Sequence, residues 1–276
     1  MYGAIIGDII GSRFEFDNGQ RTRDFDLFNE DCCFTDDTVM TVAVAQAILK
    51  GADMCSEIGA KYLFKKYARK WGSAYKGRGY GERFGYWLES SWFKAKPYGS
   101  YGNGSAMRVS PCGWVETSLT NTRRLARLSA EITHNHPDAI KGAEATASAI
   151  FMAAGEYDTK DIRNYIEKEF GYDLSRTPDD IRPNYQFHVD CARSVPEALC
   201  CFLNANSYID TIRNVMYIGG DTDTLGAIAG SVAEARWGIP ASLIHKANEY
   251  LTEDILAVIN KFYDLIGLTR YWEENT

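Results

Sequence analysis

The sequence lacks the patterns that mark several large classes of protein. It has 7 cysteines, an odd number, and no two of them form a Cys-x-x-Cys pair. A disulfide framework or a zinc site is therefore not expected, and the compartment is expected to be reducing. Acidic residues outnumber basic residues by 37 to 30. Because proteins that bind nucleic acid electrostatically usually carry an excess of basic charge, that class is disfavoured.

Long hydrophobic runs are also missing. The longest strongly apolar stretch, residues 39–49, is interrupted by Thr41 and Gln46. It falls short of the ~20 residues that span a bilayer. No basic region precedes the apolar residues near the start of the sequence, as it would in a secretory signal. We therefore expect a cytoplasmic protein without a membrane segment.

The composition is that of an ordinary globular protein, with 45% hydrophobic and 24% charged residues in 276. Apolar residues recur mostly at helical spacing, and there is no fixed-period repeat. We predict helices over residues 38–50, 122–132, 138–154, 159–170, 194–203, 208–217, 225–237 and 242–266, and loops over 17–33, 72–85, 97–104 and 172–184. No change in composition indicates a linker, so the prediction is one all-α domain, residues 1–276.

Two acidic clusters share the same setting. Residues 34–38 are Phe-Thr-Asp-Asp-Thr, residues 219–224 are Gly-Gly-Asp-Thr-Asp-Thr, and each cluster precedes a predicted helix. Helix capping is one explanation, since Asp and Thr at a helix start accept hydrogen bonds from free N–H groups. Metal binding is the other, because neighbouring carboxylates repel one another unless a cation neutralises them. The oxygen ligands that Mg²⁺ and Mn²⁺ prefer would come from Thr35, Asp36, Asp37, Asp221, Asp223 and Thr224.

A glycine-rich stretch and a few polar residues are candidates for ligand contacts. The stretch contains Gly99, Ser100, Tyr101, Gly102, Asn103 and Gly104. Its backbone could approach a phosphate closely, although an ordinary tight turn explains the same glycines. Asp8 and Glu15 lie near the end of an expected first helix, where acids are unfavourable to the helix dipole and indicate a neighbouring ligand or cation. His134 precedes a predicted helix, so capping is the alternative to a ligand contact.

Two further patterns have simpler structural explanations. Gly3, Gly7 and Gly11 recur every four residues, which places them on one helical face and favours close helix packing. Residues 61–92 interleave basic and aromatic side chains. That pattern can bind single-stranded nucleic acid, but an amphipathic helix with a solvated face, followed by a surface loop, explains it more simply.

Taken together and in order, these motifs resemble those of the ADP-ribosylglycohydrolase family. The resemblance covers residues 3–12, 34–38, 100–108, 133–134 and 219–224, and it continues through 228–230 and 238–240. It implies a compact orthogonal bundle of helices that holds two Mg²⁺ or Mn²⁺ ions at one end. The ions' ligands carry over onto the six Thr and Asp residues of the two acidic clusters.

The resemblance also implies roles for the other candidates. Residues 99–104 match the family's diphosphate-binding segment, and His134 matches a residue that contacts ADP-ribose. Asp8 is assigned with them to the substrate site. Glu15 matches a glutamate of the serine-directed branch that lies over the metals. Proton transfer is assigned to Glu15, or else to Asp36 or Asp223.

The implied activity is metal-dependent hydrolysis of the N- or O-glycosidic bond in an ADP-ribosylated protein or a small ADP-ribose conjugate. The acceptor stays open among arginine, serine, acetate, a phosphate and a base, because residues 72–85 and 172–184 match no acceptor-specific element. The oligomeric state also stays open. The rival hypotheses are a catalytically silent member that binds ADP-ribose or is structural like a lens crystallin, and a hydrolase of ADP-ribosylated nucleic acid.

Overall fold

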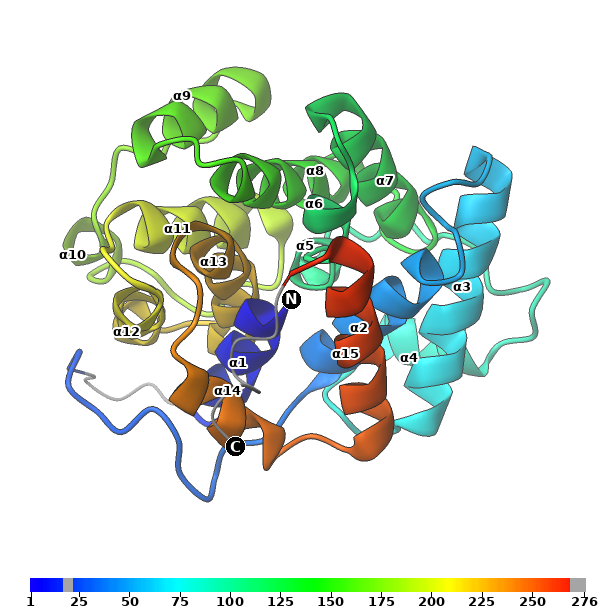
Figure 1. Cartoon of the computed structure of the whole chain (residues 1–276), viewed down its shortest axis with the longest axis horizontal. Helices are drawn as coiled ribbons and strands as arrows, with labels where there is room; N and C mark the ends of the chain where they lie inside the picture. The colour runs from blue at the N-terminus through cyan, green and yellow to red at the C-terminus, as the bar shows by residue number, and fades with distance from the viewer. Residues whose placement is uncertain (17–21, 269–276) are drawn as a thin grey trace.

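The computed structural model describes residues 1–16 and 22–268 of the chain. Those residues form 15 helices and no β-strand (Figure 1). An isolated antiparallel bridge joins Gly102 to Asp190. The prediction of an all-α fold is confirmed. No helix among the described residues is both long and apolar enough to cross a membrane.

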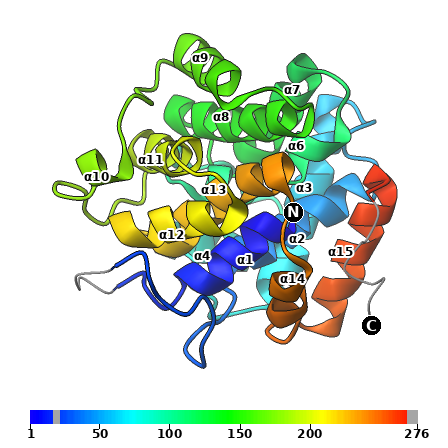
Figure 2. The ribbon, with the colours of Figure 1, turned by 60° about the vertical axis from the view of Figure 1, so that its left-hand side comes forward.

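The centre of the molecule is occupied by α13 (Thr222–Trp237). It packs against α1 (Tyr2–Gly11), α8 (Pro137–Ala154), α11 (Cys191–Leu203) and α12 (Tyr208–Ile218). Every residue of α1 is buried, as are the first 13 residues of α13, Thr222 to Glu234. Helices that are buried all round lie in the core of a protein. Figures 1 and 2 show α1 and α13 side by side within the other helices.

The contact between α1 and α13 is made by backbone rather than by side chains. A Cβ added to Gly7 would lie 2.0 Å from the carbonyl oxygen of Gly226, and one added to Gly3 would lie 2.2 Å from that of Gly230. At Gly11 the corresponding distance, to the carbonyl oxygen of Thr222, is 2.3 Å. Only glycine permits this approach. The prediction of close packing from the four-residue glycine spacing is therefore confirmed.

The remaining helices surround this pair. They are α2 (Asp36–Ile48), α3 (Glu57–Ala74), α4 (Glu82–Glu89), α5 (Gly104–Met107), α6 (Cys112–Val115), α7 (Leu119–Glu131), α9 (Thr159–Phe170), α10 (Pro178–Ile181), α14 (Ala241–Asn248) and α15 (Glu253–Ile266). Helix α2 packs against α1, α3 and α15. This arrangement brings the starts of α2 and α13, far apart in sequence, to the same region of the fold.

Several predicted boundaries were wrong. The single helix predicted over 242–266 is two helices, because Thr252 is the N-cap of a new helix whose first turn contains Glu253 and Asp254. The loop predicted over 72–85 contains the end of α3 and the start of α4. The loop predicted over 172–184 contains α10. In the loop predicted over 17–33, residues 17–21 lie outside the described residues, and the rest is not helical.

Candidate active site

The two acidic clusters lie at the first turns of two helices whose N-terminal ends meet. Thr35 is the N-cap of α2 and accepts a hydrogen bond from the backbone N–H of Asp37 over 3.3 Å. Asp221 is the N-cap of α13, and it follows Gly219 and Gly220, which have φ values of 79° and 82°. Such left-handed backbone favours glycine. Across the gap, the Thr224 hydroxyl donates to Oδ2 of Asp37 over 3.4 Å.

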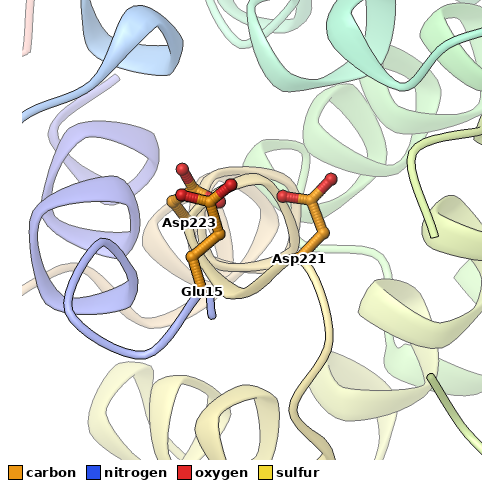
Figure 3. Close-up of side chains that lie close together, drawn as sticks. All are labelled: Glu15, Asp221 and Asp223. Atoms are coloured by element: carbon orange, nitrogen blue, oxygen red, sulfur yellow. The ribbon is translucent and has the colours of Figure 1, made fainter. Parts of the chain in front are cut away.

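Glu15 joins the second cluster from the turn that follows α1. Carboxylate oxygens of Glu15, Asp221 and Asp223 all lie within 4.8 Å of one another. Figure 3 shows the three side chains converging at the start of α13, with Glu15 reaching over from the neighbouring segment. Asp223 and Asp221 are buried, whereas Glu15 is half-buried. Glu15 is therefore the member of this group that lies nearest the solvent.

Asp8 requires a correction. It was expected to contact substrate, but it is fully buried and does not line the cavity described below. Its carboxylate accepts hydrogen bonds from the backbone N–H groups of Thr35 and Thr38, both over 3.0 Å, and from their hydroxyls over 2.7 and 2.5 Å. Asp8 thus holds the first turn of α2 in place, and its influence on the site is indirect.

Electrostatics at the site are dominated by carboxylates without a neutralising partner. Burial, reinforced by the charge of Asp223, raises the pKa of Asp36 and of Asp37 well above that of an ordinary carboxyl group. Burial also raises the pKa of Asp221 to about 6. The pKa of Glu15 is raised to about 8, first by burial and then by the charges of Asp223 and Asp8. Mutual repulsion and burial thus lead several of these carboxyl groups to hold protons at neutral pH, which a bound cation would displace.

The donor set fits a hard divalent cation. Oδ1 of Asp37 is buried and has no hydrogen-bond partner among the described residues. A buried, unsatisfied carboxylate oxygen is costly, and a metal ion would satisfy it. All the candidate donors are carboxylate or hydroxyl oxygens, the ligands that Mg²⁺ and Mn²⁺ prefer. The group formed by Glu15, Asp221 and Asp223 offers such donors; Asp36 and Asp37 would add to them from α2.

The glycine-rich turn is tied to the acidic end by Asn103. The Asn103 side-chain amide donates to Oδ2 of Asp221 over 2.6 Å and to Oγ of Ser194 over 3.1 Å. Its backbone N–H donates to the Val189 carbonyl over 2.8 Å, and the Gly102 N–H donates to Oγ of Ser100 over 3.2 Å. These bonds fix the turn in one position relative to the acids. A contact at Asn103 therefore reaches Asp221 directly.

His134 is buried beside this turn. Its Nδ1 shares a hydrogen bond with the Thr133 hydroxyl over 2.7 Å, and its Nε2 faces the turn, 3.0 Å from the position that a Cβ of Gly104 would take. Burial, and then the charges of Arg108 and Arg83, hold the pKa of His134 well below the ordinary value. The imidazole is therefore neutral near pH 7.

A cavity of about 380 Å³ brings these parts together. The predicted residues that line it are Glu15, Thr35, Asp36, Asp37, Ser100, Tyr101, Gly102, Asn103, Gly104, His134, Asp221, Asp223 and Thr224. Asp8 and Gly99 do not line it. Gly99 donates its N–H to Oδ1 of Asn135 over 2.7 Å, and its substrate contact stays a prediction.

Sequence reasoning missed a second group of lining residues. These include Gly79, Glu82, Arg83, Phe84, Tyr98, Arg108, Phe187 and Val189. Four of these eight come from residues 72–85, in which no functional element had been recognised, and Phe187 and Val189 follow the second such segment, 172–184. For Arg108 a signal was available, since it ends the motif at residues 100–108. Nothing in the sequence near Arg83 indicates that α4 turns it toward the site.

Several known proteins are similar to this chain. ADP-ribosylhydrolase ARH3 of Homo sapiens is 26% identical to the chain, and the alignment covers 93% of this chain and 90% of that protein. The Bos taurus protein of the same name is 25% identical, over the same shares of the two chains. A solved structure described as an ADP-ribosylglycohydrolase-related protein complex matches with a TM-score of 0.70 at 19% identity, covering 96% of this chain and 95% of that one.

The structural match shows the fold, and the sequence matches extend along nearly the whole chain. The profile of a single family, described as ADP-ribosylglycohydrolase, matches residues 1–272. This range contains both acidic clusters, Glu15 and the glycine-rich turn. The chain therefore belongs to the ADP-ribosylglycohydrolase family of enzymes that hydrolyse glycosidic bonds.

Proposed function

We propose that the protein cleaves the N- or O-glycosidic bond between an ADP-ribosyl group and its acceptor, in a protein or a small conjugate, and releases ADP-ribose. The observation that carries the proposal is the cavity itself, which has converging carboxylates at one end and a fixed glycine-rich turn beside them. The names of the ARH3 relatives support it. Residues 1–276 would act as one catalytic domain, since α1 and α13 from opposite parts of the chain both build the site.

The metal ligands we propose are Thr35, Asp36, Asp37, Asp221, Asp223 and Thr224. Two Mg²⁺ or Mn²⁺ ions bound there would supply Lewis acidity and a fixed hold on the ribose hydroxyls. The protein contributes the spacing of the donors. Asp8 fixes the first turn of α2 through Thr35 and Thr38, and the contact between α1 and α13 fixes the other cluster.

Glu15 is the group we propose to move the proton. Its carboxylate belongs to the cluster at the start of α13 and is the member that lies nearest the solvent. From there it can accept a proton from an attacking water or donate one to the departing acceptor at the anomeric carbon. Asp36 and Asp223 are less suitable, because metal binding would occupy their oxygens.

The turn at Gly102 and Gly104 would orient the substrate. Its backbone lies against His134 and is fixed by Asn103, so a diphosphate placed there would hold the distal ribose over the acids. Holding the reacting carbon and the proton donor in one geometry is a large part of the rate gain available to such a site.

A role in nucleic-acid binding receives little support from the segment that suggested it. Trp71 and Trp87 are buried. Lys65 donates to the Trp92 carbonyl, and Arg69 donates to the carbonyls of Trp87 and Ser90. These cations and rings make contacts within the fold, whereas Tyr62 and Tyr86 are the exposed rings of the same segment. We therefore propose a protein or small-molecule conjugate as the substrate.

The test is a panel of defined ADP-ribosyl linkages incubated with the protein and Mg²⁺ or Mn²⁺. We expect release of ADP-ribose from at least one linkage, loss of that release with EDTA, and recovery when the metal is restored. An ADP-ribosylated oligonucleotide belongs in the panel. If ADP-ribose binds but no linkage is cleaved, the proposal is wrong and the protein is a silent binder.

A further inference from the structure

The lining of the cavity includes an arginine that no motif indicated. Arg83 lies in the first turn of α4, is exposed and lines the cavity. One of its terminal nitrogens donates to the Tyr98 carbonyl, and its guanidinium carbon lies 4.8 Å from the centre of the Tyr98 ring. No carboxylate of the described residues lies within 4.0 Å of it. The side chain is thus held in position while most of its five N–H donors remain available.

Arg83 lies near the start of the glycine-rich turn. The residue it contacts, Tyr98, immediately precedes residues 99–104, and the Tyr98 ring lies 6.0 Å from that of His134. His134 in turn faces Gly104. Arg83 is therefore connected to the turn through contacts with Tyr98 and His134.

The cavity is otherwise poor in accessible positive charge. Its lining includes Glu15, Asp36, Asp37, Glu82, Asp221 and Asp223, against Arg83 and Arg108. Arg108 is 1% exposed and is engaged by the Ser129 carbonyl and the Thr133 hydroxyl, over 2.9 and 3.0 Å. Arg83 is therefore the cation among the described lining residues that a ligand can reach. Arg83 is thus available as a partner for an anionic ligand such as a diphosphate.

We propose that Arg83 pairs with the diphosphate of the ADP-ribosyl group and is a specificity-determining residue for substrates that carry it. The inference rests on the proposed function and adds a residue that contacts substrate. Guanidinium suits this task because its planar fork matches phosphate oxygens and keeps its charge at every physiological pH. The Tyr98 ring and carbonyl hold the fork in advance, which lowers the entropy lost on binding.

The first experiment measures ADP-ribose binding by calorimetry with Mg²⁺ present, for wild type, Arg83→Gln and Arg83→Lys. Loss of a charge-assisted pair should weaken ADP-ribose binding about ten- to hundredfold in Arg83→Gln. Arg83→Lys should recover part of the loss, because it restores the charge without the fork. Mg²⁺ affinity, measured with the metal alone, should match wild type in both variants.

Two control variants sharpen the result. Lys94→Gln removes an exposed cation that does not line the cavity, and it should leave ADP-ribose affinity unchanged. Glu82→Gln removes a negative charge from the same wall, next to Arg83. It should raise ADP-ribose affinity, because one source of repulsion is gone. A loss in Glu82→Gln equal to that in Arg83→Gln would show that the wall has merely been disturbed, and would overturn the proposal.

Competition by inorganic pyrophosphate and by adenosine shows which part of ADP-ribose Arg83 contacts. Pyrophosphate should compete with ADP-ribose less well in Arg83→Gln than in wild type, whereas competition by adenosine should not change. If Arg83→Gln binds ADP-ribose as wild type does and loses only kcat/KM on intact conjugates, Arg83 faces the acceptor and the proposal is overturned. Because binding is measured without turnover, failure of the proposed hydrolysis would leave this result interpretable.

Discussion

Asp8 and Glu15 are acidic residues of the same N-terminal segment that take different positions in the site. Asp8 points inward and accepts four hydrogen bonds from Thr35 and Thr38. Glu15 lies beyond the last turn of α1, where its carboxylate reaches Asp221 and Asp223. The sequence indicates that both acids need a partner, since each is unfavourable near a helix C-terminus. It does not reveal that the Asp8 carboxylate is hydrogen-bonded to the start of α2, because that contact depends on how α2 packs against α1.

We expect Glu15→Gln to separate chemistry from binding. The amide keeps the size and the hydrogen bonds of Glu15 but cannot exchange a proton, so kcat should fall about 10²- to 10⁴-fold. ADP-ribose affinity at saturating Mg²⁺ should change little. Single-turnover hydrolysis beside calorimetry tests both parts. A near-wild-type kcat would mean that Glu15 is a rim residue and that the proton is handled elsewhere.

His134 should contribute a pH dependence to stability. Its pKa is held below that of the unfolded chain by burial and by the charges of Arg108 and Arg83, with Tyr98 and Thr133 as its other neighbours. The unfolded state therefore binds the proton first. The contribution of His134 to the free energy of unfolding is therefore constant above about pH 6.5. It falls below that pH by up to about 1.4 kcal/mol per pH unit.

The measurement is the free energy of unfolding in urea at pH 7.5, 6.5 and 5.5. His134→Gln should show a smaller loss on acidification than wild type, whatever its stability at pH 7.5. His245→Gln, at an exposed site on α14, should follow the wild-type curve. Equal slopes for wild type and His134→Gln would mean that the ring is protonated in the folded state.

At the scale of helices, the sequence predicts those helix bounds that are set by local signals such as capping residues. The starts of α2 and α13 were placed near their acidic first turns, and α9 was predicted from Thr159 to Phe170 as observed. The break between α14 and α15 was missed, although Thr252 followed by two acids is a helix-start signal. The position of Arg83 was not predictable, because it depends on the packing of α4 beside residues 97–99 rather than on a pattern in the sequence.

The contact between α1 and α13 predicts a severe effect of a very small substitution. In Gly7→Ala the new methyl group would lie 2.0 Å from the Gly226 carbonyl oxygen. Backbone cannot move aside as a flexible side chain can, so the free energy of unfolding should fall by about 3 kcal/mol. Urea unfolding measures the loss.

Gly85→Ala is the matched control for this substitution. Gly85 also lies within a helix, α4, but an added Cβ would meet no atom within 4 Å. Alanine should be neutral there or stabilising by up to about 1 kcal/mol, through its better helix propensity. If Gly7→Ala were as stable as Gly85→Ala, the two helix backbones would not be in contact.

At the scale of the whole molecule, the site is assembled from distant parts of the chain. When no cation is present, repulsion between its carboxylates destabilises the fold. We therefore expect stability and metal binding to change in opposite directions in Asp223→Asn. Without metal, removal of one like charge should raise stability by about 0.5–2 kcal/mol. With Mg²⁺ present, wild type should be more stable than the variant, since a ligand at a hundred times its Kd stabilises the native state by about 2.7 kcal/mol.

Thermal unfolding with EDTA and at increasing Mg²⁺ concentrations tests this reversal in the order of stability. Glu89→Gln removes an exposed carboxylate of α4 that does not line the cavity, and it should follow wild type under both conditions. An Asp223→Asn variant that gains as much stability from Mg²⁺ as wild type does would show that Asp223 is not a ligand.

The backbone contact between α1 and α13 also governs how the chain is made. Gly11 and Thr222 are separated by 211 residues, and a ribosome adds about 5–20 residues per second. The partner of α1 therefore emerges roughly ten to forty seconds after α1 itself. During that interval a helix with Ile5, Ile6, Ile9 and Ile10, all of them fully buried in the finished fold, has no α13 to cover it. We therefore expect chaperones that bind apolar segments to hold the nascent chain, and α1 to close onto α13 late in synthesis.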